Sequence, residues 1–331
     1  MARYISDSNQ VGFFYESGTY ASTSGTIQSF GLIQEHSVTS SMNTSPIRFV
    51  GNASRDVGQQ VNVMEDYEGT LTYYPQDWKG VMFALGSIVD AGTPSPFTHN
   101  IKALNSTDGN QFTSGTLNPF ISFSIEDGQQ SSTADKDFVR TVNGCMVNSF
   151  TISATQGEPV SCELSYLAQN VVQTSGTPSS LTLATTRPFL FDDLVVSKDG
   201  TAMNTLKEFS FTINNNLDAP HYINGSKVVS VPIPANRDYE LSTTIDANET
   251  DTIPLYEENL KGGSEFNMTA VLTDVSAGTG SRNVTFTFSG CKLTVMENPT
   301  TLEGVNEQSM TIVPKTTTVL ANDTIQKYGA Y

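Results

Sequence analysis

Alternation of apolar and polar residues with a period of two recurs along most of this chain. It is clearest at residues 121–125, 145–154, 160–167, 206–213, 266–272 and 284–288. Successive side chains of a β-strand point to opposite faces, so each segment is typical of a strand with one buried face. Turn-forming pairs such as Asp127-Gly128 and Asp199-Gly200 separate the segments. The pattern predicts a mainly β protein.

Only two segments have the features of a helix. Residues 77–85 are long enough for two turns, with Asp77 as an N-cap and Gly86 as a stop. Residues 252–260 form the second candidate, which ends at Gly262-Gly263. We therefore expect one short helix flanking the strands of each half of the chain.

The two halves repeat the same features in the same order. An Asp-Tyr-Glu segment at 66–68 precedes the first helix, and another at 238–240 precedes the second. Gly144-Cys145 and Gly290-Cys291 each open a later strand. The two Asp-Tyr-Glu segments are 172 residues apart, whereas the two Gly-Cys pairs are only 146 residues apart. The first copy therefore carries about 26 extra residues between its Asp-Tyr-Glu segment and its Gly-Cys pair. We predict two tandem domains, 1–180 and 186–331, with a long loop around 90–115 in the first and a C-terminal arm in the second.

Net charge excludes one class of function. The chain has 34 acidic and 17 basic residues, which gives a formal net charge of −17. Proteins that bind duplexes gain affinity by neutralising phosphates with basic side chains, so direct binding of DNA or RNA is excluded. The acidic balance suits a conduit that repels phosphate, and it equally suits a surface that only aids solubility.

The cysteine spacing and the N-terminal residues indicate whether a chain like this is exported from the cell or bound to a membrane. Cys145, Cys162 and Cys291 are odd in number and show no C-x-x-C spacing, so we expect free buried thiols. Residues 1–18 lack a basic start followed by an apolar run, and no apolar run is long enough to cross a bilayer. We therefore expect neither a secretory signal nor a membrane partner.

Catalytic motifs are missing from the sequence. His36, His99 and His221 lie far from any G-x-S-x-G turn, and no phosphate-binding glycine loop opens a helix. Residues 246–251 offer oxygen ligands, but Asp251 stands where a calcium loop needs glycine. We expect no enzyme activity, no catalytic residues, no cofactor and no metal.

The second half has a characteristic order of elements. A strand ends in residues 213–217 (INNNL), a glycine hairpin follows at 222–227, and a Pro-Ile-Pro corner at 232–234 leads into a strand at 237–242. Residues 117–120 and 142–150 of the first half contribute similar strands. This order resembles the tail tube proteins of long-tailed, siphovirus-like viruses of bacteria or archaea.

The resemblance implies a structural virion protein with two tandem β-barrel or β-sandwich domains, each with one short flanking helix. Its relatives form rings of six tube domains, and the rings stack into a tail tube that delivers the genome. A duplicated chain would supply six domains as a trimer with pseudo-sixfold symmetry, and a hexamer with one decorating domain per chain is the alternative. The tape-measure protein and viral DNA would pass through the lumen without specific binding. Tail terminator and baseplate proteins would be further partners, and assembly would take place in the host cytoplasm.

Contacts between subunits are implied at matching turns of the two halves. Residues 48–51 match residues 222–225, and the asparagine-rich strand end lies nearby in the sequence. The candidate contact residues are Arg48, Gly51, Asn214, Asn215, Asn216, Tyr222, Asn224 and Gly225.

A β-sandwich adhesion or carbohydrate-binding module of a fibre or surface layer is the alternative function. Such a module should cluster exposed aromatic residues over one sheet face. The Tyr and Phe residues here are instead spread along the alternating strands, which favours core positions and an assembly role.

Overall fold

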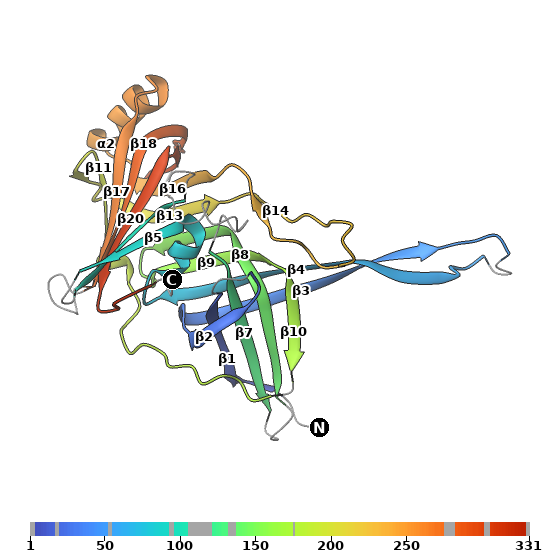
Figure 1. The fold of residues 1–331 in the computed structure, drawn as a ribbon. Helices are drawn as coiled ribbons and strands as arrows, with labels where there is room; N and C mark the ends of the chain where they lie inside the picture. The colour runs from blue at the N-terminus through green and yellow to red at the C-terminus, as the bar shows by residue number, and fades with distance from the viewer. Residues whose placement is uncertain are drawn as a thin grey trace.

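The chain folds into layered β-sheets, as the alternation predicted. The computed structural model describes residues 4–16, 20–51, 55–92, 96–104, 121–131, 137–174, 176–274, 282–300 and 305–328. Its strands form sandwich-like layers, and within the described residues no sheet closes into a barrel (Figure 1). The sandwich form of the predicted fold is therefore confirmed.

One sheet, here called the shared sheet, contains strands from both halves. Its antiparallel neighbours are, in order, β3 (Gly31–Ile47), β4 (Gln59–Pro75), β9 (Ser161–Ala168), β8 (Phe138–Thr155), β13 (Leu206–Asn214), β16 (Asp238–Asp246), β19 (Glu307–Val313) and β18 (Asn283–Glu297). Only the C-terminal parts of β8 and β18 belong to it.

The N-terminal parts of β8 and β18 continue into two outer sheets. The first outer sheet is β2 (Thr23–Gln28), β1 (Tyr4–Glu16), β7 (Phe123–Ser131), β8 and β10 (Asn170–Thr174). The second is β12 (Thr201–Ala202), β11 (Leu194–Lys198), β17 (Phe266–Thr273), β18, β20 (Thr316–Asp323), β6 (Phe97–Ala103) and β5 (Gly86–Ala91). A separate pair, β14 (Leu217–Asp218) and β15 (Ile233–Pro234), lies in the loop between β13 and β16.

The halves repeat the same strand pairing. In the shared sheet β3-β4-β9-β8 corresponds to β13-β16-β19-β18, and β2-β1-β7-β8-β10 corresponds to β12-β11-β17-β18-β20 in the outer sheets. Shifts in the pairing register also recur at matching places. The shift between Val147 and Ser149 of β8 has its counterpart between Leu293 and Val295 of β18. The sequence repeat is therefore also a repeat of strand order, whereas the domain limits 1–180 and 186–331 stay predictions.

The helices lie where the sequence predicted them. Helix α1 (Lys79–Leu85) ends at Gly86, whose φ of 91° is the left-handed conformation that favours glycine. The second helix begins as α2 (Glu249–Pro254) and continues as the π-helical η2 (Leu255–Lys261). A short 3₁₀ turn, η1 (Phe191–Asp193), precedes β11.

Two predicted segments have a different structure. Part of the loop expected around 90–115 is a hairpin, because β5 and β6 extend the second outer sheet beside β20; residues 105–115 lie outside the described residues. The contact of the expected C-terminal arm with a neighbouring chain stays a prediction. Residues 316–323 form β20 between β18 and β6, because the alternating residues Val319 and Ala321 give this strand a buried apolar face. Tyr328 is also fully buried in this chain.

Aromatic side chains fill the core of each half. In the first half Phe83 of α1 lies against Phe13, Phe30 and Phe123, with ring centroids 4.4–5.9 Å away. The second half has its own cluster, in which Phe211 and Phe288 are 4.7 Å apart. All three cysteines are free and buried, as predicted. Helix α1 thus packs between sheets of the first half and holds them together.

Candidate assembly interface

The two halves meet inside the chain through a continuous strand pair, here called the internal junction. Strand β8 of the first half pairs with β13 of the second from Thr155 opposite Glu208 to Ser149 opposite Asn214. Hydroxyl groups face one another across the pair, with Thr151 and Thr212 Oγ1 atoms 3.0 Å apart. Main-chain hydrogen bonds therefore join the halves into one sheet.

A buried asparagine reinforces the internal junction. The Asn215 side-chain amide donates to the carbonyl oxygens of Ala84 in α1 at 3.0 Å and of Val147 in β8 at 2.9 Å. Its Oδ1 atom accepts a hydrogen bond of 2.7 Å from Nε of Arg237, which also donates to the carbonyl of Leu85. The second half therefore satisfies carbonyl groups at the end of α1 that the helix itself leaves free.

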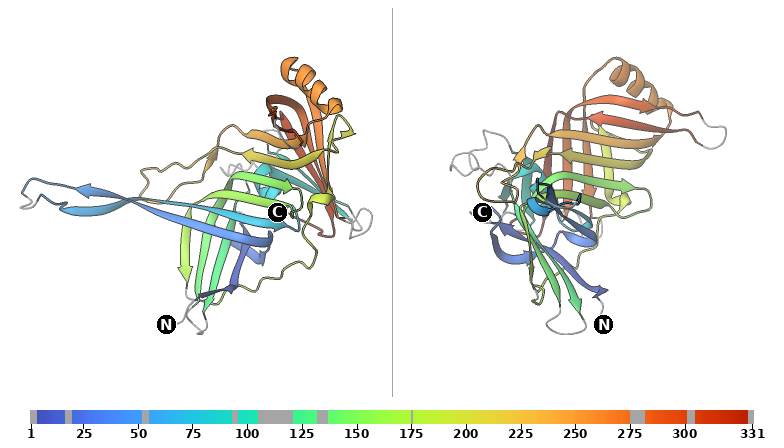
Figure 2. Two further views of the ribbon diagram at one scale, coloured as in Figure 1. Left: turned by 180° about the vertical axis from the view of Figure 1, so that it is seen from behind. Right: turned by 90° about the vertical axis from the view of Figure 1, so that its right-hand side faces the viewer.

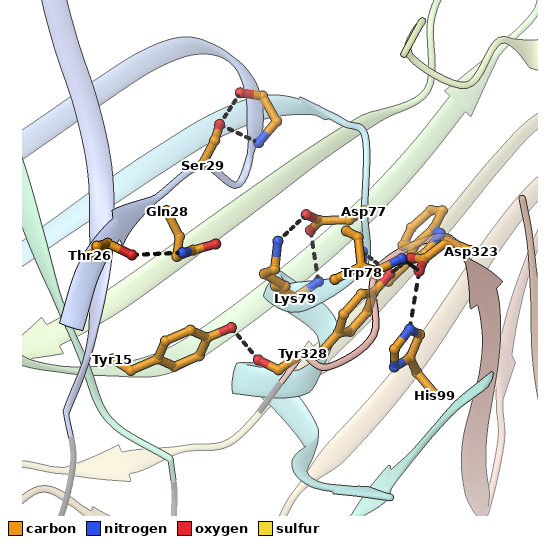
Figure 3. Close-up of polar contacts among 12 residues, drawn as sticks. Tyr15, Thr26, Gln28, Ser29, Asp77, Trp78, Lys79, His99, Asp323 and Tyr328 are labelled. Carbon is orange, nitrogen blue, oxygen red and sulfur yellow. Dashed lines mark hydrogen bonds and ion pairs between the residues drawn. The ribbon is translucent and has the colours of Figure 1, made fainter. Parts of the chain in front are cut away.

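The end of the chain seals the other side of α1 (Figure 3). The Tyr328 hydroxyl donates to Asp323 and accepts from the main-chain N–H of Trp78, while the Tyr15 hydroxyl donates to the Tyr328 carbonyl. Trp78 packs against Phe189 and Phe286 of the second half at 5.4 Å. As a result all seven residues of α1 are buried.

A buried histidine connects β5, β6 and β20 in the same region (Figure 3). The His99 ring stacks on Tyr328 at 3.8 Å, with Nδ1 2.6 Å from Asp90 Oδ1 and Nε2 3.1 Å from Asp323 Oδ1. Burial disfavours the charged imidazole, but hydrogen bonds to Asp323 and Asp90 outweigh it, so the pKa of His99 lies above its ordinary value. The His99 ring therefore links the β5–β6 hairpin to β20 of the second half.

The shared sheet has an open edge at each end. Among the described residues β3 pairs only with β4, and the shared-sheet part of β18 pairs only with β19. At the β18 edge Val295 is 48% exposed. Open edges with unpaired N–H and C=O groups are surfaces onto which another strand adds.

One face of the shared sheet is lined by hydroxyl and carboxylate groups. It carries Glu68, Thr70 and Thr72 on β4, Glu163 and Ser165 on β9, Thr151 and Ser153 on β8, Glu208, Ser210 and Thr212 on β13, Glu240, Ser242 and Thr244 on β16, and Ser309 and Thr311 on β19. The opposite face of the same strands is apolar and buried. The hydrophilic face is therefore the one that this chain presents to solvent.

The β3–β4 hairpin projects far beyond the sheets (Figures 1 and 2). Its distal residues are exposed on both faces, and several are apolar: Met42, Ile47, Phe49, Val50, Val61, Val63 and Met64. The loop between β13 and β16 runs beside it, since the N–H of Glu65 donates to the Lys227 carbonyl at 2.9 Å and His221 Nε2 is 2.8 Å from Asp66 Oδ1. Solvated apolar side chains on a narrow ribbon are typical of a contact surface.

The structure places the predicted contact residues on the hairpin, on the loop beside it and at the end of β13. Arg48 and Gly51 lie at the hairpin tip, where the Arg48 guanidinium donates to the Arg55 carbonyl at 2.9 Å. Tyr222, Asn224 and Gly225 are exposed on the neighbouring loop, and Asn216 is exposed with φ of 47°. Asn214 is half-buried at the end of β13.

Asn215 differs from these, because its side chain is 1% exposed and bonded within the chain. The apolar ribbon residues were missed because Val61 and Val63 alternate like core positions. The signal that points to a projection is the opposite strand, where residues 37–45 are almost entirely polar and offer no core face.

Sites for other chemistry are scarce in the part of the chain that the structure describes. It contains no group of three or more His, Cys, Asp or Glu side chains placed to hold a metal ion. A cavity of about 380 Å³ lies between β11, β12 and β13, lined by Phe191, Val195, Met203 and Lys207 among others. Its lining residues include neither histidine nor cysteine. None of the described helices has both the length and the apolar character that crossing a bilayer requires.

Comparisons with known proteins identify a family. A family model described as a phage tail tube protein matches residues 13–326. A solved structure, the tube-terminating cap of the anti-feeding prophage, is similar at 16% identity with a TM-score of 0.32, over 42% of this chain and 94% of the cap. No curated protein matches the chain.

Proposed function

Because the chain belongs to the phage tail tube protein family, we propose that it is the repeating subunit of a viral tail tube, assembling with further copies of itself into rings that stack. Its role is structural rather than enzymatic, and the product of assembly is a conduit for genome delivery. Assembly takes place in the host cytoplasm before the tail joins the virion.

The internal junction is the main support for this proposal. The two open edges of the shared sheet, on β3 and β18, can form the same strand pairing between two chains. The first half uses the outer edge of β8 to bind β13, which is the β3 equivalent of the second half. In the second half the strand edge that corresponds to the outer edge of β8 belongs to β18. In the first half the strand that corresponds to β13 is β3, whose outer edge can accept a partner strand in the same way. Adding β18 of one chain to β3 of the next continues the shared sheet without a break.

The repeat also specifies the register of the pairing between chains. Ser149 lies opposite Asn214 at the internal junction. Counted from the Gly-Cys pairs, Val295 stands in β18 where Ser149 stands in β8. Asp66 and Asp238 open the two Asp-Tyr-Glu segments and are therefore equivalent. Ser41 lies opposite Asp66 and Asn214 lies opposite Asp238, so Ser41 of β3 is equivalent to Asn214 of β13. We therefore place Val295 of one chain opposite Ser41 of the next.

Closure of this head-to-tail arrangement produces a ring. Three chains supply six equivalent halves and a pseudo-sixfold ring, and six chains with one tube-forming half each are the alternative. Rings stack through the apolar tip of the β3–β4 hairpin, Phe49 and Val50, and through the loop beside it. Tail terminator and baseplate proteins close the two ends of the stack.

The hydrophilic face of the shared sheet lines the lumen. Its hydroxyl groups satisfy one another across strands, as at Thr151 and Thr212, and its carboxylates include Glu163, Glu208 and Glu240. Negative groups repel the phosphates of a passing duplex, so viral DNA moves through without sticking. The tape-measure protein passes along the same face before the DNA.

Electron microscopy and mass measurement of the purified protein test the proposal. Hollow rings or tubes are expected, with ring masses of three chains or six. A double Ser41→Cys and Val295→Cys variant should form a disulfide between chains under oxidation, and each single variant should not. A wild-type chain that stays monomeric at every salt and protein concentration would overturn the proposed function.

A further inference from the structure

The two helices occupy the same place in their halves and differ sharply in exposure. Helix α1 follows β4 and packs on β8, and the α2–η2 helix follows β16 and packs on β18. All of α1 is buried. The α2–η2 helix buries Leu255 and Asn259 but leaves Ile253 60% exposed and Tyr256 42% exposed.

The exposed residues match residues of α1 that are buried. Counted from the Asp-Tyr-Glu segments, Ile253 and Tyr256 stand at the positions of Val81 and Ala84. Both of these are fully buried, at 0% exposure. The second half supplies part of that cover, because Asn215 binds the Ala84 carbonyl and Phe189 and Phe286 pack on Trp78.

We propose that the outward face of the α2–η2 helix, centred on Ile253 and Tyr256, binds the first half of a second copy of this chain. This inference rests on the proposed function and adds a second contact to the pairing of β18 with β3. Because η2 packs on β18, one incoming chain reaches the open strand edge and the helix face together.

The internal junction identifies the opposing residue on the second copy. Ser41 of β3 is equivalent to Asn214 of β13, because they lie opposite the equivalent residues Asp66 and Asp238. The next residues along the chain are Met42 and Asn215. Met42 therefore stands in the first half where Asn215 stands in the second, and it faces Tyr256 of the neighbouring chain. Met42 is 44% exposed, so two solvated apolar side chains cover one another in this contact.

The charged groups around this face favour a small apolar contact with a polar rim. Lys261 Nζ lies 5.9 Å from the centre of the Tyr256 ring and 3.7 Å from a Glu257 carboxylate oxygen. Such a rim stays in water while the two apolar residues are covered, which is the usual anatomy of a contact between protein chains.

An aspartate at position 253 tests the contact. Ile253→Asp changes an exposed side chain, so the isolated chain should keep its melting temperature, whereas the concentration needed for assembly should rise at least about tenfold. Leu183→Asp serves as the matched control, because Leu183 is 52% exposed on the linker between the halves. The control should assemble like the wild type.

A paired-cysteine experiment identifies the opposing residue directly. A Met42→Cys and Tyr256→Cys double variant should form disulfides between chains once rings assemble, and the single variants should not. The native thiols are all buried, so they leave the surface free for this readout.

The outcomes separate this inference from the proposed function. A wild-type chain that never assembles overturns both. Wild-type rings together with normal assembly of Ile253→Asp, or with no disulfide in the double variant, overturn the helix contact and leave the tube function standing.

Discussion

Gly144 and Gly290 hold the same left-handed backbone conformation, with φ of 69° and 62°, at the same place in two long strands. Each is followed by a fully buried cysteine, and each lies where its strand leaves an outer sheet for the shared sheet. A residue with a Cβ atom is strained in this conformation. Glycine at these two positions therefore allows both halves to bend in the same way.

Substituting these glycines should destabilise the chain unequally. A Cβ atom at position 144 would lie 2.7 Å from the Tyr20 ring, so Gly144→Ala adds a steric clash to a backbone cost of about 1–2 kcal/mol. At position 290 the nearest atoms belong to the flexible Lys315 side chain, and Gly290→Ala should cost less. Urea denaturation measures both losses.

A third glycine isolates the backbone term. Gly25 has φ of 79°, and a Cβ atom there would meet nothing within 4 Å, so Gly25→Ala reports the conformational cost alone. Equal losses for Gly144→Ala and Gly25→Ala would show that the contact with Tyr20 is unimportant.

Removing the Asn215 amide should destabilise the single chain rather than only its assembly. Asn215→Ala leaves the carbonyl oxygens of Ala84 and Val147 without their buried donor and removes the Oδ1 acceptor of the Arg237 Nε, which costs about 2–3 kcal/mol. Asn62→Ala, on the exposed part of β4, should be neutral within about 0.5 kcal/mol. Chemical denaturation of the monomer measures both, and a normal monomer that fails only to form rings would make Asn215 an intersubunit contact.

Strand positions were predictable from sequence because a strand of this fold needs one apolar face. Residues 150–154 and 209–213 alternate strictly, and they lie in the parts of β8 and β13 that meet at the internal junction. The resemblance to tail tube proteins is likewise confirmed by the match over residues 13–326. Local periodicity and turn chemistry thus carried the fold class and the family.

Other features depend on distant partners that periodicity does not reveal. Residues 316–323 look like a threonine-rich tail, but they alternate just enough to pair with β6 from the other half. Asn215 looks like a loop residue, and only the positions of α1 and β8 make it a buried bridge. The projecting hairpin escaped prediction because its exposed Val61 and Val63 have the pattern of a core strand.

Protonation of His99 should make stability depend on pH. Its pKa is raised in the folded chain, so its contribution is fully present below the unfolded value of about 6.5 and is lost as pH rises through the folded value. His99→Gln lacks this contribution. The difference in melting temperature between wild type and variant should therefore be largest below about pH 6.5 and shrink as the pH rises above that value.

A histidine outside this cluster provides the comparison. His221→Gln removes a partly exposed ring whose carboxylate neighbour, Asp66, lies on the projecting hairpin. It should lower the melting temperature less than His99→Gln does at pH 6. A melting-temperature difference for His99→Gln that stays constant with pH would contradict titration of the His99 ring.

The apolar tip of the β3–β4 hairpin should be needed for stacking rings and not for forming them. Phe49 is 55% exposed and Val50 is fully exposed, and neither contributes to the core of its own chain. Replacing both with serine removes apolar area worth about 1–2 kcal/mol per covered side chain in each ring-to-ring contact. A ring presents several hairpins at once, so the losses add and long tubes become unstable.

The expected product of the Phe49→Ser and Val50→Ser variant is therefore single rings of normal mass with few tubes, seen by negative-stain microscopy and sedimentation. Val89→Ser is the matched control, because Val89 is 57% exposed on β5, away from the hairpin. Tubes of normal length from the tip variant would assign stacking to another surface. Loss of the rings themselves would place the tip within the ring instead, beside the pairing of β18 with β3.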